Sequence, residues 1–261
     1  MKKILLTLAV LTLALGFVSC GKNKKLQETT DLLAISFAKL GKYPTNGSGF
    51  GPDSMCYDGK DVVLTLSVQK DVAPIPNFSF DKWIKPYAVS TLLGNGLNNF
   101  VLGKTLETKQ GGNPSEDYLK LMEENGAQFK VVVKTTAGTK TYVITPEEAK
   151  KLLAMPKEDH ALFAASSVFI AQIHEFKVNK VVKDVKIEGN VCSIDLMIDE
   201  KQFVSKLETM PAILGYVILN NLELKVNGTI IPKEDVKKEW DEGKQVLFNN
   251  PPQDEKGNNV A

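Results

Sequence analysis

The chain contains two stretches in which apolar and polar residues alternate. One follows Gly59 and the other follows Gly189, and in both the third, fifth, seventh and ninth residues after the glycine are apolar. Alternation with a period of two is typical of a β-strand that buries one face. We therefore expect the following side chains to face the core: Val62, Leu64, Leu66, Val68, Cys192, Ile194, Leu196 and Ile198.

Each of these strands is followed by a helical pattern that contains a proline. Trp83 and Ile84 precede Pro86, and Leu207 precedes Pro211. Because a proline ring clashes with the preceding helical turn, each helix is expected to start anew or to kink at its proline. Trp83 is interpreted as a core residue of the first of these helices.

Each half of the chain then contains a hairpin pattern. Apolar residues alternate through 129–144 around a turn near Gly138, and a shorter pattern spans 222–231. The second hairpin contains Asn227-Gly228, a residue pair typical of a type I′ turn. Both hairpins run into helices that begin with a proline, Pro146 and Pro232.

These patterns predict an α+β protein. It would consist of two copies of an α-β-α-β-β-α unit, with antiparallel hairpins packed against helices. The copies span 27–155 and 156–240, and each opens with an amphipathic helix, at 33–40 and at 161–173.

Two segments fall outside this repeat. The first copy carries an insertion near 94–115 that is rich in glycine and asparagine, and Gly94-Asn95-Gly96 within it is interpreted as a helix stop. The C-terminal tail, 241–261, contains Pro251-Pro252 and few apolar residues, so it is expected to be largely disordered.

The N-terminus has the features of an export signal. Lys2 and Lys3 precede the uncharged, apolar stretch 4–17, which is too short to span a bilayer. The stretch ends in Phe17-Val18-Ser19-Cys20-Gly21, which resembles a lipobox, although Phe17 stands where leucine is commonest. We predict a signal peptide over 1–19, lipidation of Cys20 and a tether over 20–26. The alternative is an ordinary signal peptide that happens to end beside a cysteine.

Charge excludes one class of partner. Removal of 1–19 takes away Lys2 and Lys3 and no acidic residue, which leaves 30 basic and 31 acidic side chains. This balance is not that of a nucleic-acid-binding protein. The only basic run that stands out, 22–25, follows the lipid and is interpreted as a tether beside anionic headgroups.

Three stretches carry a resemblance to a known family. Val62–Val68, the helix from Phe203 to Pro211, and the turn and helix start from Gly138 to Glu148 are similar to a family of uncharacterised cell-envelope lipoproteins from Bacteroidales and their relatives. The resemblance implies a compartment and an architecture, and no catalytic residues carry over from it. The basic residues after Cys20, with Gly21 in place of a retaining aspartate, then imply an outer-membrane lipoprotein that faces the periplasm.

The sequence contains none of the common catalytic or metal-binding motifs. Its two histidines, His160 and His174, are 14 residues apart and are interpreted as helix-end residues, so we expect no metal and no cofactor. Cys56 and Cys192 would form a disulfide or act as two separate small apolar residues, and the second interpretation is favoured. 

Acidic residues offer one route to catalysis. Asp81, Asp199 and Glu200 follow the two strands, and they are interpreted as helix-start charges unless folding pairs them. The alternative function that they suggest is an envelope hydrolase with acidic catalysis.

If the chain has a recognition surface, we expect it in the loop over 44–58 and in the insertion near 94–115; the alternative is that the aromatic residues of the loop pack into the core. Tyr43, Phe50 and Tyr57 lie in or beside it, and exposed aromatic rings stack on sugars or fill a partner's pocket. Asp53-Ser54-Met55 is similar to the short O-glycosylation acceptor of the same bacteria, which makes Ser54 a candidate for modification.

The leading function is therefore non-enzymatic: an anchored envelope lipoprotein that binds a protein or glycan partner or has a structural role. A third alternative is an immunity or inhibitor lipoprotein that blocks an exported toxin.

Overall fold

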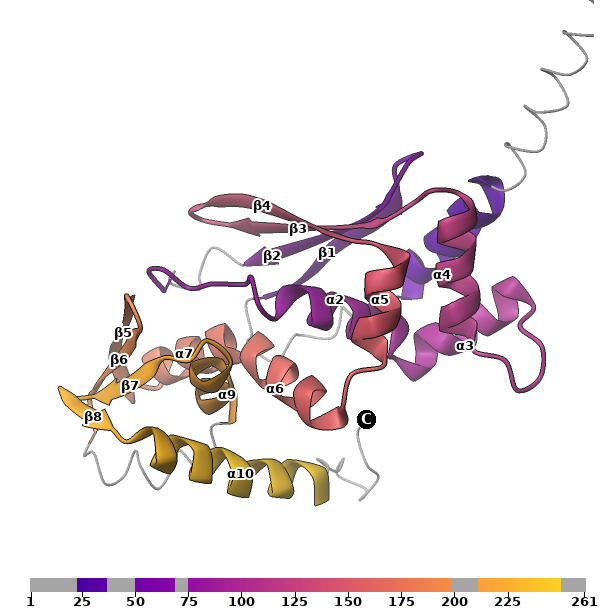
Figure 1. The fold of residues 1–261 in the computed structure, drawn as a ribbon. Helices are drawn as coiled ribbons and strands as arrows, with labels where there is room; N and C mark the ends of the chain where they lie inside the picture. The colour runs from indigo at the N-terminus through magenta and orange to yellow at the C-terminus, as the bar shows by residue number, and fades with distance from the viewer. Residues whose placement is uncertain (1–22, 37–49, 69–74, 199–210, 250–261) are drawn as a thin grey trace, which may run out of the picture.

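The structure is a computed structural model that describes residues 23–36, 50–68, 75–198 and 211–249 (Figure 1). The described part of the chain is a mixed α/β protein with two four-stranded sheets, in agreement with the predicted fold class. None of the described helices is long and apolar enough to cross a membrane.

The first sheet has the strand order β1-β2-β3-β4. β1 and β2 pair antiparallel, β2 and β3 pair parallel, and β3 and β4 pair antiparallel. Its strands are β1 (Phe50–Tyr57), β2 (Val62–Val68), β3 (Phe129–Thr135) and β4 (Gly138–Ile144).

The second sheet has the order β5-β6-β7-β8, with the same succession of antiparallel, parallel and antiparallel pairs. Its strands are β5 (Val182–Glu188), β6 (Val191–Leu196), β7 (Glu223–Val226) and β8 (Thr229–Ile231). Asn227 and Gly228 both have positive φ, as the predicted type I′ turn requires.

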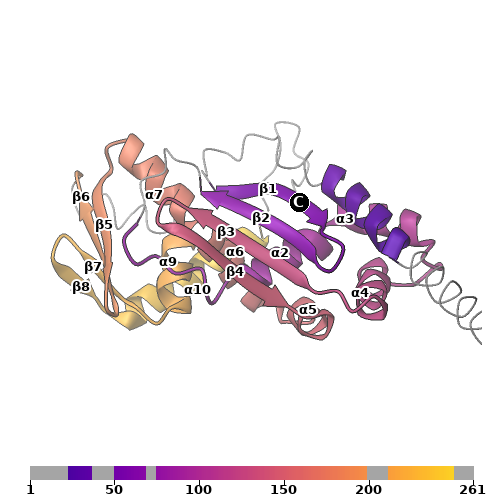
Figure 2. The same cartoon turned by 90° about the horizontal axis from the view of Figure 1, so that it is seen from above.

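Helices cover one face of each sheet, as Figures 1 and 2 show. A helix over 23–36 opens the described chain. The others are α2 (Ile84–Leu93), α3 (Gly96–Leu106), α4 (Pro114–Glu124), α5 (Pro146–Leu153), α6 (Lys157–Ser167), α7 (Phe169–Val178), α9 (Pro211–Leu219) and α10 (Lys233–Asn249). α6 packs against both α2 and α9, so it joins the two halves of the molecule.

Two clusters of buried apolar side chains form the core. One lies under the first sheet and includes Trp83, Tyr118 and Phe129, and the other lies under the second sheet and includes Phe169 and Tyr216. The predicted strand faces are confirmed, because all eight side chains are buried or packed against these clusters. Removal of this apolar surface from water is the main force that holds each sheet to its helices.

The two halves are similar in the features that suggested a repeat. Gly59 and Gly189 both lie, with positive φ, in the turn between the first two strands of a sheet. Pro86 and Pro211 both lie in the first turn of a helix that follows the second strand, as the third residue of α2 and the first residue of α9. These correspondences agree with two related units; their origin by duplication stays a prediction.

The predicted unit was incomplete, because β1 and β5 add an edge strand to each sheet. Both strands contain a register shift, at Pro52/Ser54 in β1 and at Val182/Asp184 in β5. Such a bulge breaks the period of two, and a proline is tolerated on an edge strand, so neither segment shows an uninterrupted strand pattern. The loop predicted over 44–58 is accordingly wrong for Phe50–Tyr57.

Four other boundaries differ from prediction. The tether is shorter than 20–26, because 23–26 form the first helical turn and Leu26 is fully buried. The insertion near 94–115 is largely helix α3, which Asn95 caps by accepting a hydrogen bond from the Leu97 amide. The helix predicted at 161–173 is two helices, which meet at Val168. α10 extends to Asn249, so the first part of the predicted tail is helical.

Candidate functional site

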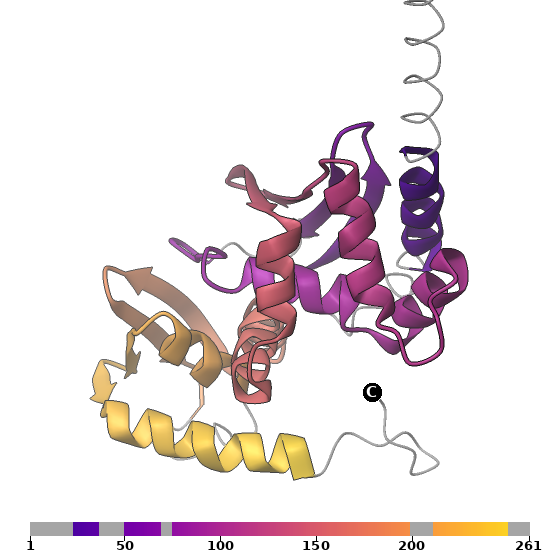
Figure 3. The same ribbon diagram turned by 45° about the vertical axis from the view of Figure 1, so that its right-hand side comes forward.

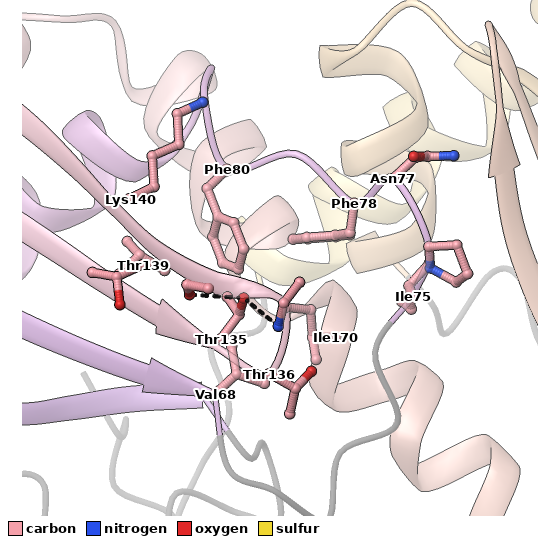
Figure 4. Close-up of a pocket in the computed structure, with 14 residues that line it drawn as sticks. Val68, Ile75, Asn77, Phe78, Phe80, Thr135, Thr136, Thr139, Lys140 and Ile170 are labelled. Carbon is pink, nitrogen blue, oxygen red and sulfur yellow. Dashed lines mark hydrogen bonds between the residues drawn. The ribbon is translucent and has the colours of Figure 1, made fainter.

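A cavity of about 470 Å³ lies between the two halves of the molecule (Figure 4). Three stretches line most of it: the end of β2 at Val68, the segment 75–80, and the turn between β3 and β4. Ile170 of α7 contributes from the second half of the chain. We call this site the junction cavity.

A tight turn places the segment 75–80. The Phe78 amide donates a hydrogen bond to the Ile75 carbonyl (3.1 Å), and Asn77 between them has a φ of 60°. Pro76 followed by a residue with positive φ is the signature of a type II turn, in which asparagine is tolerated. The Asn77 side chain then donates to the carbonyl of Ile187 at 2.8 Å, so the turn is attached to β5.

Phe78 is the apolar link between the two halves. Its ring stacks on Tyr216 and Phe169, with centroid distances of 4.6 and 5.5 Å, and meets the Phe80 ring edge-on at 5.0 Å. It packs against both buried clusters. Offset and edge-to-face pairs of this kind are favourable beyond the surface they bury.

The Tyr216 hydroxyl adds a polar contact to this link. It accepts a hydrogen bond from the Ser79 amide at 3.0 Å, and burial raises the pKa of Tyr216 to about 12. The phenol therefore stays protonated at neutral pH, and the segment 75–80 is held by both aromatic packing and a neutral hydrogen bond.

The opposite wall of the junction cavity is the β3–β4 hairpin. Thr135 stabilises its turn: its hydroxyl donates to the Gly138 carbonyl (3.1 Å) and accepts from the Ala137 amide (3.2 Å). These bonds are drawn in Figure 4, where the turn faces Phe78 and Phe80.

Asp81 fastens this hairpin to the start of α2. Its carboxylate forms an ion pair with Lys140 and accepts a hydrogen bond from the Tyr142 hydroxyl at 2.8 Å. The hydrogen bond from Lys140 is the main cause that lowers the pKa of Asp81 below its usual value, so the group is ionised at neutral pH. Asp81 thus acts as a structural clamp at the rim of the cavity.

The lining determines what the junction cavity can hold. Apolar side chains and threonines dominate it, and among the described residues that line it Lys140 is the only charged one. No histidine, cysteine or carboxylate belongs to this described lining, and its charged residue, Lys140, is paired with Asp81. The arrangement suits an apolar group flanked by hydrogen-bonding atoms.

Two other hollows are less suited to binding. A groove of about 680 Å³ between α4 and α5 is lined mainly by charged side chains, and Lys150 and Glu123 in it form an ion pair at 3.4 Å. A smaller hollow of about 140 Å³ lies between α2 and α6 and includes His160 and Tyr87.

The predicted recognition loop is not the site that the structure builds. Tyr43 lies outside the described residues, and Phe50 begins β1. Tyr57 is buried, and its hydroxyl donates to the Gly59 carbonyl at 3.0 Å, so it belongs to the core. Of the two interpretations of Tyr57, core packing is the one that the structure supports, because the inward-facing positions of β1 alternate and Tyr57 shares that face with Met55.

The remaining predicted residues are scattered. Ser54 is exposed on β1. Its O-glycosylation stays a prediction. Asp199 and Glu200 lie outside the described residues, so their pairing with Asp81 is untested. His160 and His174 lie on different helices, α6 and α7. Across the described ranges, no group of three or more potential ligands is placed to hold a metal ion.

Both described cysteines are free thiols: Cys56 is exposed on β1, and Cys192 is buried on β6. This agrees with the favoured interpretation of two separate residues. Burial raises the pKa of the Cys192 thiol to about 12, so it behaves as an apolar side chain.

Comparison with protein-family models, with curated proteins and with solved structures gave no match. The resemblance to envelope lipoproteins therefore stays a prediction from the sequence, and the site is interpreted from its own residues.

Proposed function

We propose that the chain is an exported lipoprotein, anchored to a membrane through Cys20, whose folded body binds a partner protein without catalysis. The observation that carries the binding part is the junction cavity, because its size falls in the range of ligand pockets, roughly 300–1,000 Å³, and its lining is mainly apolar. The anchor rests on the lipobox-like sequence that ends at Cys20 and Gly21.

A protein partner is favoured over a glycan by the polar groups at the cavity. A sugar needs several donors and acceptors for its hydroxyls, and two of the strongest groups here are already engaged. Asn77 donates to Ile187, and Lys140 pairs with Asp81. An apolar side chain of a partner needs few such groups, since its transfer out of water is itself favourable.

Crosslinking from inside the cavity tests the binding proposal. A photoreactive amino acid at Thr136, which is exposed and lines the cavity, should crosslink one discrete envelope protein in cells. The same probe at Ile230, exposed on the second sheet, is the matched control. Adding Ala137→Trp, which fills the cavity from the exposed turn, should abolish the product, whereas Ala137→Ser should not. A product that survives the tryptophan, or that forms equally from Ile230, would contradict the proposal.

The anchor is tested separately. Labelling cells with a radioactive or alkyne-bearing fatty acid should tag the wild-type chain, and Cys20→Ser should abolish the tag and release the protein from the membrane fraction. Retention of the tag in that variant would refute lipidation at Cys20.

We further propose that the anchored body faces the periplasm from the outer membrane, from the basic residues that follow Cys20. A protease added to intact cells should leave it whole and should degrade it only after lysis. Degradation of the body in intact cells would place it on the cell surface instead.

A further inference from the structure

Two neighbouring helices expose apolar side chains in pairs. Leu32 and Ile35 on helix 23–36 are 45% and 56% exposed, and Leu97 and Phe100 on α3 are 45% and 63% exposed. Residues three apart in a helix share a face, so each pair forms a short apolar stripe. The other large exposed apolar side chains of the described chain are distributed singly over other elements, which is ordinary for a protein surface.

Two hydrogen bonds hold the two helices side by side. The Ser36 hydroxyl donates to the Asn98 side chain at 3.1 Å, and the Lys25 ammonium donates to the Thr105 carbonyl at 2.6 Å. The contacts join the end of one helix to the beginning of the other, so the helices run antiparallel. At 3.6 residues per turn, Leu32 falls on the same face as Lys25 and Ser36 and borders this helix–helix contact. Ile35 and Leu97 lie roughly a quarter turn from the contact on their helices, and Phe100 lies farther round α3.

Phe100 and Lys104 on α3 form a pair of the kind found at the boundary between a membrane and water. The Lys104 ammonium lies 5.9 Å from the centroid of the Phe100 ring, one turn away. A lysine beside an apolar ring can bury its stem and keep its charge at the level of the headgroups. Figures 1 and 3 show helix 23–36 at the end of the molecule opposite to the second sheet, with α3 and α4 beside it.

The proposed lipid anchor at Cys20 would hold this apolar surface close to the membrane. Cys20 precedes residue 23 by three residues, a span of at most about 11 Å. The start of the helix is therefore held beside the headgroups. If the helix stood upright, Ile35 would be roughly 18 Å farther from the membrane; if it lies flat, both stripes reach the interface.

We propose that Leu32, Ile35, Leu97 and Phe100 form a second contact with the lipid bilayer, which lays helix 23–36 and α3 along the membrane surface. The proposal rests on the lipid anchor at Cys20 and adds an orientation to it. A single acyl attachment leaves the body free to rotate, whereas an apolar surface beside it fixes which side faces the lipid.

Fluorescence quenching in vesicles tests this orientation. The full chain, purified from the envelope of the cells that produce it and carrying Cys56→Ser and a single added cysteine, is labelled with an environment-sensitive dye and reconstituted in phosphatidylethanolamine–phosphatidylglycerol vesicles. Flotation first establishes whether the chain is anchored. With the dye at Leu97→Cys, lipids that carry a spin label should quench the emission several-fold. With the dye at Ile230→Cys, which is similarly exposed on the second sheet, they should not.

A variant sharpens the result. Ile35→Ser with Phe100→Ser should reduce quenching at position 97 at least threefold and leave flotation unchanged, because the acyl chains remain. Flotation without quenching at position 97, or equal quenching at 97 and 230, would overturn the membrane contact and leave the anchor standing. Failure to float would refute the anchor, and this inference with it; neither result bears on crosslinking from the junction cavity.

Discussion

The two sheets have the same strand order and pairing, but they differ in the hairpin that completes them. β3 and β4 have seven residues each, whereas β7 has four and β8 has three. The longer hairpin places its turn beside the end of β2, and there it forms one wall of the junction cavity. The shorter hairpin has no such extension.

The second turn instead closes onto its own sheet. The Asn227 amide donates to the Ile194 carbonyl at 3.0 Å, and the Asn227 side chain accepts from the Leu196 amide at 2.8 Å. The β7–β8 turn thus forms hydrogen bonds with the end of β6, whereas the β3–β4 turn borders the junction cavity. Among the described residues, the two similar sheets therefore differ in what their hairpin turns face: the longer hairpin lines the junction cavity, and the turn of the shorter one bonds to its own sheet.

The largest expected effect compares equivalent strands. Leu66→Ala should lower the free energy of unfolding by about 3–4 kcal/mol, because Leu66 is fully buried and the change leaves a cavity. Leu196→Ala should cost only about 1 kcal/mol, because Leu196 is partly exposed. Urea unfolding followed by circular dichroism measures both values. Equal losses would mean that the two strands do not differ in burial.

Phe78 tests whether the halves unfold together. Phe78→Ala should lower stability by about 3 kcal/mol through loss of its contacts with Phe169 and Tyr216, and should separate one unfolding transition into two. Phe78→Leu keeps much of the apolar volume and serves as the control. Calorimetry would contradict the linking role if the alanine variant still unfolded in a single transition.

Close packing between helices is expected to matter more in the second half. A Cβ at Gly215 of α9 would lie 2.7 Å from the Ala165 Cβ of α6, so Gly215→Ala should destabilise by about 1–3 kcal/mol. Gly96→Ala in α3 meets nothing within 4 Å and should change stability by less than about 0.5 kcal/mol. Thermal unfolding that ranks the two variants the other way would disprove the tight α6–α9 contact.

Acid sensitivity should trace in part to the clamp on the β3–β4 hairpin. Because the folded pKa of Asp81 is lowered, its carboxylate contributes stability above the ordinary value of 3.8, and this contribution is lost as the pH falls through the lower folded pKa. Asp81→Asn should be less stable at neutral pH and should lose less stability below pH 3.8. The effect is small because the pair is solvent-exposed. The prediction would be contradicted if the free energies of unfolding of the wild type and Asp81→Asn fell by the same amount as the pH is lowered.

Cys56 and Cys192 should differ in chemical reactivity, with no effect on stability, which makes this the smallest of the expected effects. At pH 8 a thiol reagent should label Cys56 rapidly, whereas Cys192 should react only in denaturant, because burial keeps it protonated and inaccessible. In the lipidated chain, Cys56→Ser should abolish labelling in native buffer and leave the labelling of Cys192 in denaturant. Fast labelling in that variant would place Cys192 at the surface.

Local patterns were enough to predict much of the fold. The alternation around Leu64 and Ile194 gave the core strands, and Asn227-Gly228 gave a turn whose positive φ angles the structure reproduces. These features depend on neighbours in sequence, since a period of two and a two-residue turn are set by the local backbone. β1 and β5 were missed because a bulge interrupts the period in each.

The junction cavity, by contrast, could not be predicted. Ile75-Pro76-Asn77-Phe78 carries the signature of a turn, and Gly138 that of another, but no local pattern brings two segments about 60 residues apart to face each other. Only packing decided this, because Phe78 stacks on Phe169 and Tyr216 and Asp81 pairs with Lys140. The sequence by itself determined most of the strands and the two hairpin turns, and it supplied the lipobox-like stretch on which the proposed anchor rests. The tertiary structure decided which of them meet, because long-range burial of aromatic rings and the pairing of distant charges are energies that no short stretch of chain contains.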